Sequence, residues 1–274
     1  MLGNEIKNAK VLITVKTYPM PTPSYEEIVC TAGLTENGDW IRIYPIPYRD
    51  LPFREQFKKY EWIKLNLLKK TSDFRRESYS PAMMYDEEIT IVGSIDTKNN
   101  WRRRKEIILK NVYDSFDELI VLAKTEYLSL GTIKPKEILG FEIERDDRDW
   151  PEEYSKRLEQ YKLFENVNNR RSLIRKLPYK YYYKFLTTDN KVRRLQIFDW
   201  EIGALFWNCL ENRENDESAA NDMVRFKYFD DFVINKDLYL FVGTSYRHHK
   251  MMVDNPFSII GIFYPPIETQ PTLI

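Results

Sequence analysis

The chain of 274 residues carries 42 basic and 42 acidic side chains, and 43% of its residues are hydrophobic. This composition excludes a disordered chain and a generally basic protein, and it provides enough apolar surface for a packed core. The first residues, MLGNEIKNAKVLITV, lack the long apolar segment of a signal peptide, and no stretch approaches the roughly 18 apolar residues of a membrane helix. We therefore expect a cytoplasmic protein that makes no membrane contact.

The first half of the chain is a run of short predicted strands. Alternating or β-branched residues predict strands at 11–18, 28–35, 40–46, 62–68, 88–95 and 137–144. Asn37-Gly38 is a strong hairpin signal between the second and the third of them. Mixed spacings of three and four between apolar residues predict a long amphipathic helix over 101–125. This pattern favours a small barrel within residues 1–148, either of the oligonucleotide-binding (OB) type or PUA-like.

The second half, residues 149–274, mixes helices with strands. We expect a charged helix at about 151–166, a hairpin of strands 179–186 and 192–198, helices beginning at Asp199 and at about Asp216, and buried strands at 238–242 and 257–263. The chain is therefore predicted to be an α+β protein of two β-rich modules. The first is the barrel with inserted helices, and the second carries a basic-aromatic hairpin and a C-terminal strand pair.

Two phrases of the first half carry a resemblance to a known family. They are VCTAGLTENGDWIRIYP, at 29–45, and SLGTIKPKEILGFEIE, at 129–144. Over about residues 10–145 the chain resembles uncharacterised bacterial proteins with a dual oligonucleotide-binding-fold (DuOB-like) region. The resemblance implies a nucleic-acid or conflict-related setting, such as antiviral defence, and brings no catalytic signature with it.

The most informative stretch is RRSLIRKLPYKYYYKFLTTDNKVRR, at 170–194. It has nine basic residues against one acidic residue, with four tyrosines and one phenylalanine interleaved. Cations neutralise phosphates and exposed rings stack on unpaired bases, so the stretch predicts a surface for single-stranded nucleic acid. The residues assigned to this surface are Arg170, Arg171, Arg175, Lys176, Tyr181, Tyr183, Lys184, Arg193 and Arg194. The preceding segment, 137–165, has ten acidic against five basic residues and is expected to form a separate face that repels a polyanion.

Further basic residues join this prediction. Arg102, Arg103 and Arg104 stand at the start of the expected helix, where cations oppose the helix dipole and gain little stability. Arg42 shares a strand face with aromatic residues that could stack a base, although a core role for those rings is the simpler interpretation.

The loop GTSYRHHK, at 243–250, holds the densest set of reactive groups. His248 or His249 could serve as the general base of a metal-independent phosphodiester cleavage, with Arg247 or Lys250 holding the phosphate. The alternative is a basic loop that only contacts phosphate. Two isolated cysteines and two adjacent histidines make no zinc site, and nucleotide-binding motifs are absent, so we expect neither a metal nor a cofactor.

Three functions are open at this point. The leading hypothesis is a protein that binds nucleic acid, most plausibly single-stranded RNA or DNA, in bacterial defence or nucleic-acid processing. The second is a metal-independent nuclease or phosphodiesterase effector that uses His248 or His249. The third is a structural subunit whose charged faces dock a protein partner.

Overall fold

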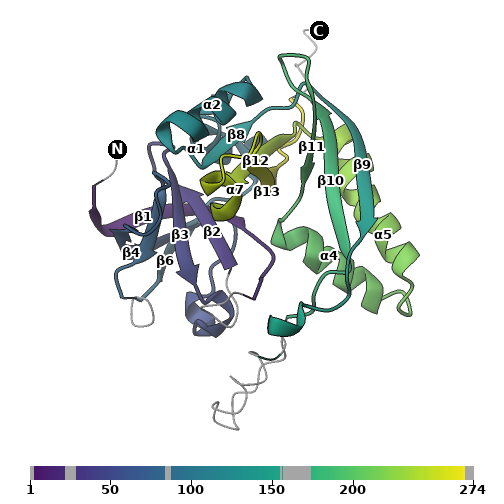
Figure 1. The fold of residues 1–274 in the computed structure, drawn as a ribbon, viewed down its shortest axis with the longest axis horizontal. Coiled ribbons are helices and arrows are strands. Elements are labelled where there is room, and N and C mark those ends of the chain that lie inside the picture. The colour runs from purple at the N-terminus through teal and green to yellow at the C-terminus, as the bar shows by residue number, and fades with distance from the viewer. Residues whose placement is uncertain (1–2, 22–28, 84–87, 155, 157–173, 269–274) are drawn as a thin grey trace.

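The computed structural model describes residues 3–21, 29–83, 88–154, 156 and 174–268. Its first part is a closed five-stranded barrel (Figure 1). The barrel strands are β1 (Glu5–Lys16), β2 (Val29–Leu34), β3 (Trp40–Ile46), β4 (Glu61–Lys69) and β5 (Ser78–Pro81). They follow the order β1-β2-β3-β5-β4, β4 pairs back with β1, and β3 runs parallel to β5. The predicted α+β class, with a small barrel and inserted helices, is confirmed.

Alternating apolar residues fill the barrel. Val11 and Ile13 of β1 and Ile63 and Leu67 of β4 are fully buried in one core cluster, because alternate strand residues point to the same face. The predicted hairpin forms between β2 and β3, and Gly38 adopts a φ of 88° there, a left-handed conformation that glycine accepts at low cost. Two short 3-10 turns, η1 (Tyr48–Asp50) and η2 (Phe53–Glu55), connect β3 to β4.

Two expected elements of the first half differ in the structure. The strand predicted at 88–95 is β6 (Thr90–Ser94), which pairs with β4 outside the ring, while the fifth barrel strand is β5, whose short sequence SYSP gives little strand signal. The helix predicted at 101–125 is two helices, α1 (Lys98–Ile108) and α2 (Phe116–Glu126), with β7 (Val112–Tyr113) between them. The hydroxyl of Ser115 accepts a hydrogen bond from Glu118 N and so begins α2 as an N-cap.

The second part contains two further sheets. One has the order β13-β12-β8-β7, built from β8 (Leu130–Ile133), β12 (Tyr239–Thr244) and β13 (Phe257–Phe263) with β7. The other has the order β11-β10-β9, built from β9 (Glu137–Arg145), β10 (Tyr179–Leu186) and β11 (Val192–Gln196). The strand predicted at 137–144 therefore forms as β9, but it pairs with β10 and does not close the barrel.

Helices of the second half cover one face of the β9–β10–β11 sheet (Figure 1). They are α4 (Trp200–Glu211), α5 (Glu217–Arg225), the π-helical turn η4 (Phe226–Asp231) and α6 (Phe232–Asn235), and the short α7 (Tyr246–Lys250) follows β12. Asp199 caps α4 as predicted, because its carboxylate accepts from Glu201 N. None of the helices in the described ranges is long and apolar enough to cross a bilayer.

The β12–β13 hairpin packs against the outside of the barrel. Val15 and Trp40 of the barrel share a buried cluster with Phe241 of β12 and Phe263 of β13. The rings of Trp40 and Phe241 meet edge to face with centroids 5.4 Å apart. This apolar contact brings the end of β12, and with it α7, beside the barrel.

Candidate nucleic-acid interface

The basic run of the β10–β11 hairpin is paired with carboxylates. Arg194 forms ion pairs with Glu142, at 2.6 Å, and with Glu144, both on β9. Arg193 and Lys191 both pair with Asp117 at the start of α2. Antiparallel pairing lays the acidic segment of β9 along the basic segment of β10, so the two charge runs cancel locally.

The other basic residues of the run follow the same pattern. Lys176 and Lys180 each lie 2.9 Å from the Asp146 carboxylate, and Arg175 pairs with Glu211. Lys184 is exposed and has no ion-pair partner within the described ranges. Arg170 and Arg171, which were also assigned to this surface, lie outside the described residues. Surface pairs of this kind leave little net charge for a polyanion.

The predicted stacking rings Tyr181 and Tyr183 belong to the core. Both are completely buried, the Tyr181 hydroxyl donates to Asn221 Oδ1 at 2.8 Å, and the Tyr183 hydroxyl donates to the main-chain oxygen of Tyr228. A ring without an exposed face cannot stack on a base, so the assignment of these two tyrosines to the surface is wrong. Strand alternation turns Tyr182 outward, where the Arg194 guanidinium covers it at 3.6 Å.

Arg42 is also inside the protein. It is 4% exposed, and its guanidinium donates to the main-chain oxygen of Ser129 at 3.2 Å and to that of Thr244 at 3.4 Å. Its assignment to a nucleic-acid surface is therefore wrong, because a phosphate has no access to it. Arg42 instead joins the barrel to β8 and β12.

A second buried arginine reinforces that junction. The Arg75 guanidinium pairs with Asp73, with its shortest contact at 2.6 Å, and donates to Thr244 O at 2.9 Å. Burial alone would raise the pKa of Asp73, but hydrogen bonds and charge from Arg75, together with a hydrogen bond from Ser78, lower it to about 2. The Glu77 carboxylate accepts from Ser129 N and Oγ at 2.8–3.1 Å, so the carboxylates at this junction are held by donors.

The arginines of α1 have three different environments. Arg104 donates twice to Ile95 O and stacks over Tyr60 at 3.8 Å, so it anchors the helix to the barrel. Arg102 pairs with Glu106 one turn further along the helix. Arg103 is exposed and has no ion-pair partner in the described part of the chain. In the view of Figure 1, α1 lies apart from the β9–β10–β11 sheet, with β12 and β13 between them.

The two adjacent histidines differ completely. His249 is 1% exposed, its Nε2 donates to Ala123 O at 2.7 Å, and its Nδ1 accepts from the Thr244 hydroxyl at 3.0 Å. Both ring nitrogens are occupied and burial lowers the pKa of His249, so this histidine is a neutral structural residue and its assignment as a general base is wrong. His248, the preceding residue of α7, is exposed.

A cluster of rings and cations surrounds α7. The Phe74 ring contacts those of Tyr127 and Tyr246 at centroid distances of 5.4 and 5.5 Å. Tyr127 and Tyr246 are 46% and 40% exposed. Arg247 and Lys250 are exposed, and neither has a carboxylate partner among the described residues. We name the surface formed by Phe74, Tyr127, Tyr246, Arg247, His248 and Lys250 the α7 surface.

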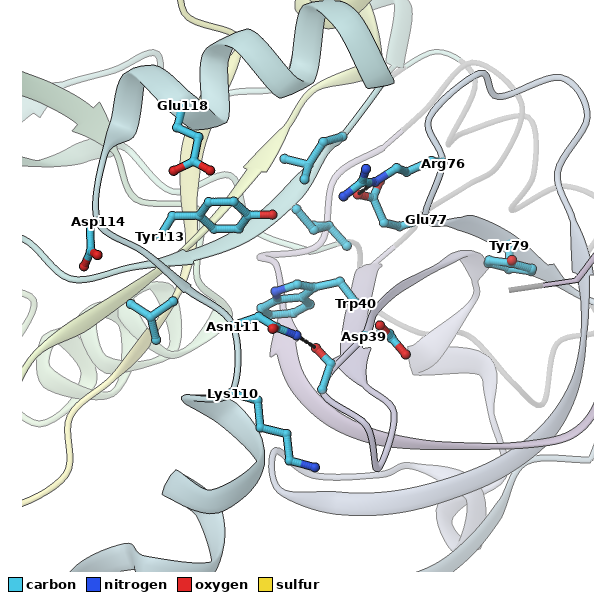
Figure 2. A pocket seen from close by; sticks show the side chains of 14 residues that line it. Asp39, Trp40, Arg76, Glu77, Tyr79, Lys110, Asn111, Tyr113, Asp114 and Glu118 are labelled. Atoms are coloured by element: carbon cyan, nitrogen blue, oxygen red, sulfur yellow. Dashed lines mark hydrogen bonds and ion pairs between the residues drawn. The ribbon is translucent and has the colours of Figure 1, made fainter. Parts of the chain in front are cut away.

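A cleft of about 720 Å³ adjoins the α7 surface and runs between the barrel and α2. Arg76 connects the two features, since it lines the cleft, its amide N donates to Tyr127 O at 3.2 Å and its guanidinium pairs with Glu126. In Figure 2, Trp40 lies in the middle of the cleft. Tyr113 and Asn111 are on one side of it, and Arg76 and Glu77 are on the other. The Trp40 indole nitrogen is buried and has no hydrogen-bond partner within the described ranges.

Comparison with known proteins places the second half in a family. Residues 112–273, more than half of the chain, match the family described as Domain of unknown function (DUF8757). The chain belongs to this family. Residues 7–110, which hold the barrel and α1, match a second family, Domain of unknown function (DUF8758). The two matches meet at residue 111, just before β7, while the division expected at 148 stays a prediction.

The other comparisons include a weakly similar solved structure. It is titled "Structure of murine DNA binding protein bound with ds DNA", is 10% identical, and aligns over 97% of this chain and 100% of its own with a TM-score of 0.33. No curated protein matches the chain. The DuOB-like resemblance, the bacterial defence setting and the cytoplasmic location stay predictions.

Sequence reasoning found part of the candidate interface. Arg247, His248 and Lys250 were named in advance, and they do lie on an exposed surface. Phe74, Tyr127 and Tyr113 were missed, because they come from separate segments that only the fold brings together. Tyr246 carried a visible signal, since it stands within the same GTSYRHHK stretch as the cations.

Proposed function

We propose that the protein binds single-stranded nucleic acid, RNA or DNA, at the α7 surface. The observation that carries this proposal is that two exposed cations, Arg247 and Lys250, have no carboxylate partner among the described residues and lie on the same surface as the exposed rings of Tyr246 and Tyr127. Such cations neutralise phosphates and such rings stack on unpaired bases. The hairpin of β10 and β11 has the greater density of cations in sequence, but its carboxylate neighbours already occupy them.

Rigid support favours the same surface. Phe74 contacts Tyr127, Tyr246 and the buried His249 ring, whose centroid lies 5.0 Å away. The guanidinium of Arg75 lies 5.7 Å from the Tyr246 ring, held there by Asp73. Rings fixed in this way lose little conformational entropy when a base stacks on them.

The test compares two matched double variants by fluorescence anisotropy with labelled oligonucleotides. Arg247→Gln with Lys250→Gln should weaken binding to all sequences and flatten the dependence of log K on log salt by about 1.4, the value for two lost single-strand phosphate contacts. Arg193→Gln with Arg194→Gln removes the same charge from the hairpin and should leave affinity nearly unchanged. Equal losses in both variants, or none in the first, would overturn the assignment to the α7 surface.

The same experiment separates the competing functions. RNA and DNA strands are titrated in parallel, and the strands are recovered in the presence of a chelator to see whether they are intact. Cleavage that disappears in His248→Ala would establish the nuclease alternative, for which His248 is the accessible histidine of the pair. Failure of the wild-type protein to bind either strand at low salt would favour the structural subunit.

A further inference from the structure

We propose that the cleft at Trp40 is a base-recognition pocket that receives a guanine from the strand held at the α7 surface. Because the guanine belongs to that strand, this inference rests on the proposed function. The cleft, of about 720 Å³, has the size of an ordinary small-ligand site. A nucleobase that leaves its stack is typically read by hydrogen bonds to its Watson–Crick edge and by aromatic contact.

The unpaired donor in the cleft is the first element of the recognition. Trp40 is 9% exposed, and its indole N–H is buried without a partner in the described part of the chain. A buried unpaired donor costs free energy, and tryptophan normally satisfies it. The nitrogen has almost no accessible surface, so a ligand carbonyl would restore that hydrogen bond only after the atoms that cover the nitrogen move.

Unused acceptors are the second element. Asp114 and Glu118 line the cleft and have exposed carboxylates without ion-pair partners among the described residues. Figure 2 shows the Glu118 carboxylate directed toward the Tyr113 ring, and the Tyr113 hydroxyl directed into the cleft. Burial raises the pKa of the Tyr113 phenol, with Glu118 adding to the effect, so the hydroxyl remains a donor or acceptor near pH 7.

The charged residues that line the cleft favour a neutral ligand in its interior. Four carboxylates line the cleft against the two cations Arg76 and Lys110. Arg76 is paired with Glu77 and Glu126, and the Lys110 ammonium donates to Glu36 O at 2.7 Å. A phosphate inside the cleft would meet net repulsion, and an ammonium ligand would leave the indole donor unpaired.

Among the bases, guanine matches this arrangement best. Its O6 is an acceptor for the Trp40 indole, and its N1–H and N2–H groups are adjacent donors for one carboxylate, for which Glu118 is placed beside Tyr113. Adenine and cytosine each offer a single amino donor group on that edge, and uracil offers a single N–H. The Tyr113 ring provides an aromatic face for the purine.

The first experiment uses guanosine alone, so that it does not depend on strand binding. The Trp40 indole signal in a ¹H–¹⁵N spectrum is assigned as the one lost in Trp40→Phe. Guanosine should shift this signal saturably, with an affinity about tenfold above those of adenosine, cytidine and uridine. Glu118→Gln should reduce guanosine affinity by about tenfold, while Asp117→Asn should retain it, because Asp117 lies on the same helix, pairs with Lys191 and Arg193 and does not line the cleft.

The second experiment adds the strand. A uridine strand with one central guanosine should bind more tightly than an all-uridine strand, and Trp40→Phe should abolish the difference without weakening the all-uridine strand. The inference is overturned if guanosine does not shift the indole signal, or if all four nucleosides shift it equally. Strand binding that survives such a result leaves the proposed function intact, whereas guanosine binding without strand binding refutes the proposed function alone.

Discussion

The Arg75 guanidinium lies 2.9 Å from the main-chain oxygen of Thr244, the last residue of β12 before the α7 segment. Arg42 donates to the same oxygen at 3.4 Å. Two buried arginines of the first half therefore hold the position from which the α7 surface extends. The orientation of the proposed interface depends on ion pairs and hydrogen bonds that the solvent does not reach. A change in the protonation of the side chains that form them should therefore change the free energy of unfolding.

The first prediction concerns Asp73 and acid stability. Its pKa of about 2 in the folded protein lies below the ordinary value of 3.8. A lowered pKa of an acid stabilises the fold above the unfolded pKa, and the stabilisation is lost as pH falls from about 4 to about 2. The contribution is about 2 kcal/mol. Chemical denaturation of Asp73→Asn at these pH values should lack this part of the acid dependence; an unchanged slope would contradict the assignment.

The second prediction separates the neighbouring histidines. His249→Ala leaves the carbonyl of Ala123 and the hydroxyl of Thr244 without their buried partner and should cost about 3 kcal/mol of unfolding free energy. His248→Ala changes an exposed residue and should stay within about 0.5 kcal/mol. Thermal melts of the two variants provide the comparison. Equal melting temperatures would show that His249 is not the structural member of the pair.

The pKa of His249 is lowered for a different reason from that of Asp73. Burial disfavours the charged ring of His249, whereas Arg75 favours the charged carboxylate of Asp73. Burial lowers the pKa of His249 below the ordinary 6.5, so the folded state prefers the neutral ring. The stabilisation is present above about pH 6.5 and decreases as pH falls further, because the unfolded chain takes up the proton first. His249→Phe should therefore show a smaller stability difference between pH 7 and pH 5 than the wild type, measured by urea denaturation.

The third prediction uses the alternation of β10. Tyr183→Ala removes a fully buried ring and should destabilise the protein by about 3–5 kcal/mol. Tyr182→Ala removes a ring that only meets the Arg194 guanidinium at the surface and should cost about 1 kcal/mol or less. Urea denaturation distinguishes the two, and the reverse order would mean that the strand presents its other face to the core.

The fourth prediction concerns stacking at the proposed interface. Tyr246→Ala should reduce affinity for a single strand by about 1–3 kcal/mol while leaving the melting temperature nearly unchanged, since Tyr246 is 40% exposed. Tyr182→Ala is the matched control on the hairpin, and we expect its affinity to equal that of the wild type. A loss of single-strand affinity in Tyr182→Ala, together with normal binding by Tyr246→Ala, would assign the interface to the β10–β11 hairpin instead.

Local chemistry along the chain determined much of the fold. Apolar and β-branched residues predicted strands at β1, β3 and β4, and the Asn37-Gly38 pair predicted a tight turn, so these strands and the hairpin could be predicted from the sequence. The cap at Asp199 was readable for the same reason, because its carboxylate acts within two residues. The fifth barrel strand could not be predicted from the sequence, because SYSP gains its strand conformation only from pairing with β3 and β4.

The candidate interface was decided by tertiary structure. A run of nine cations in sequence predicts a polyanion surface only if no carboxylates lie across from it, and β9 places Glu142 and Glu144 there. The sequence does not distinguish the two adjacent histidines. In the structure, the five-residue helix α7 directs His249 inward to Ala123 and leaves His248 in solvent. Charge and ring chemistry belong to the residues themselves, but access to a ligand depends on long-range pairing and burial, and those depend on which distant segments the core brings together.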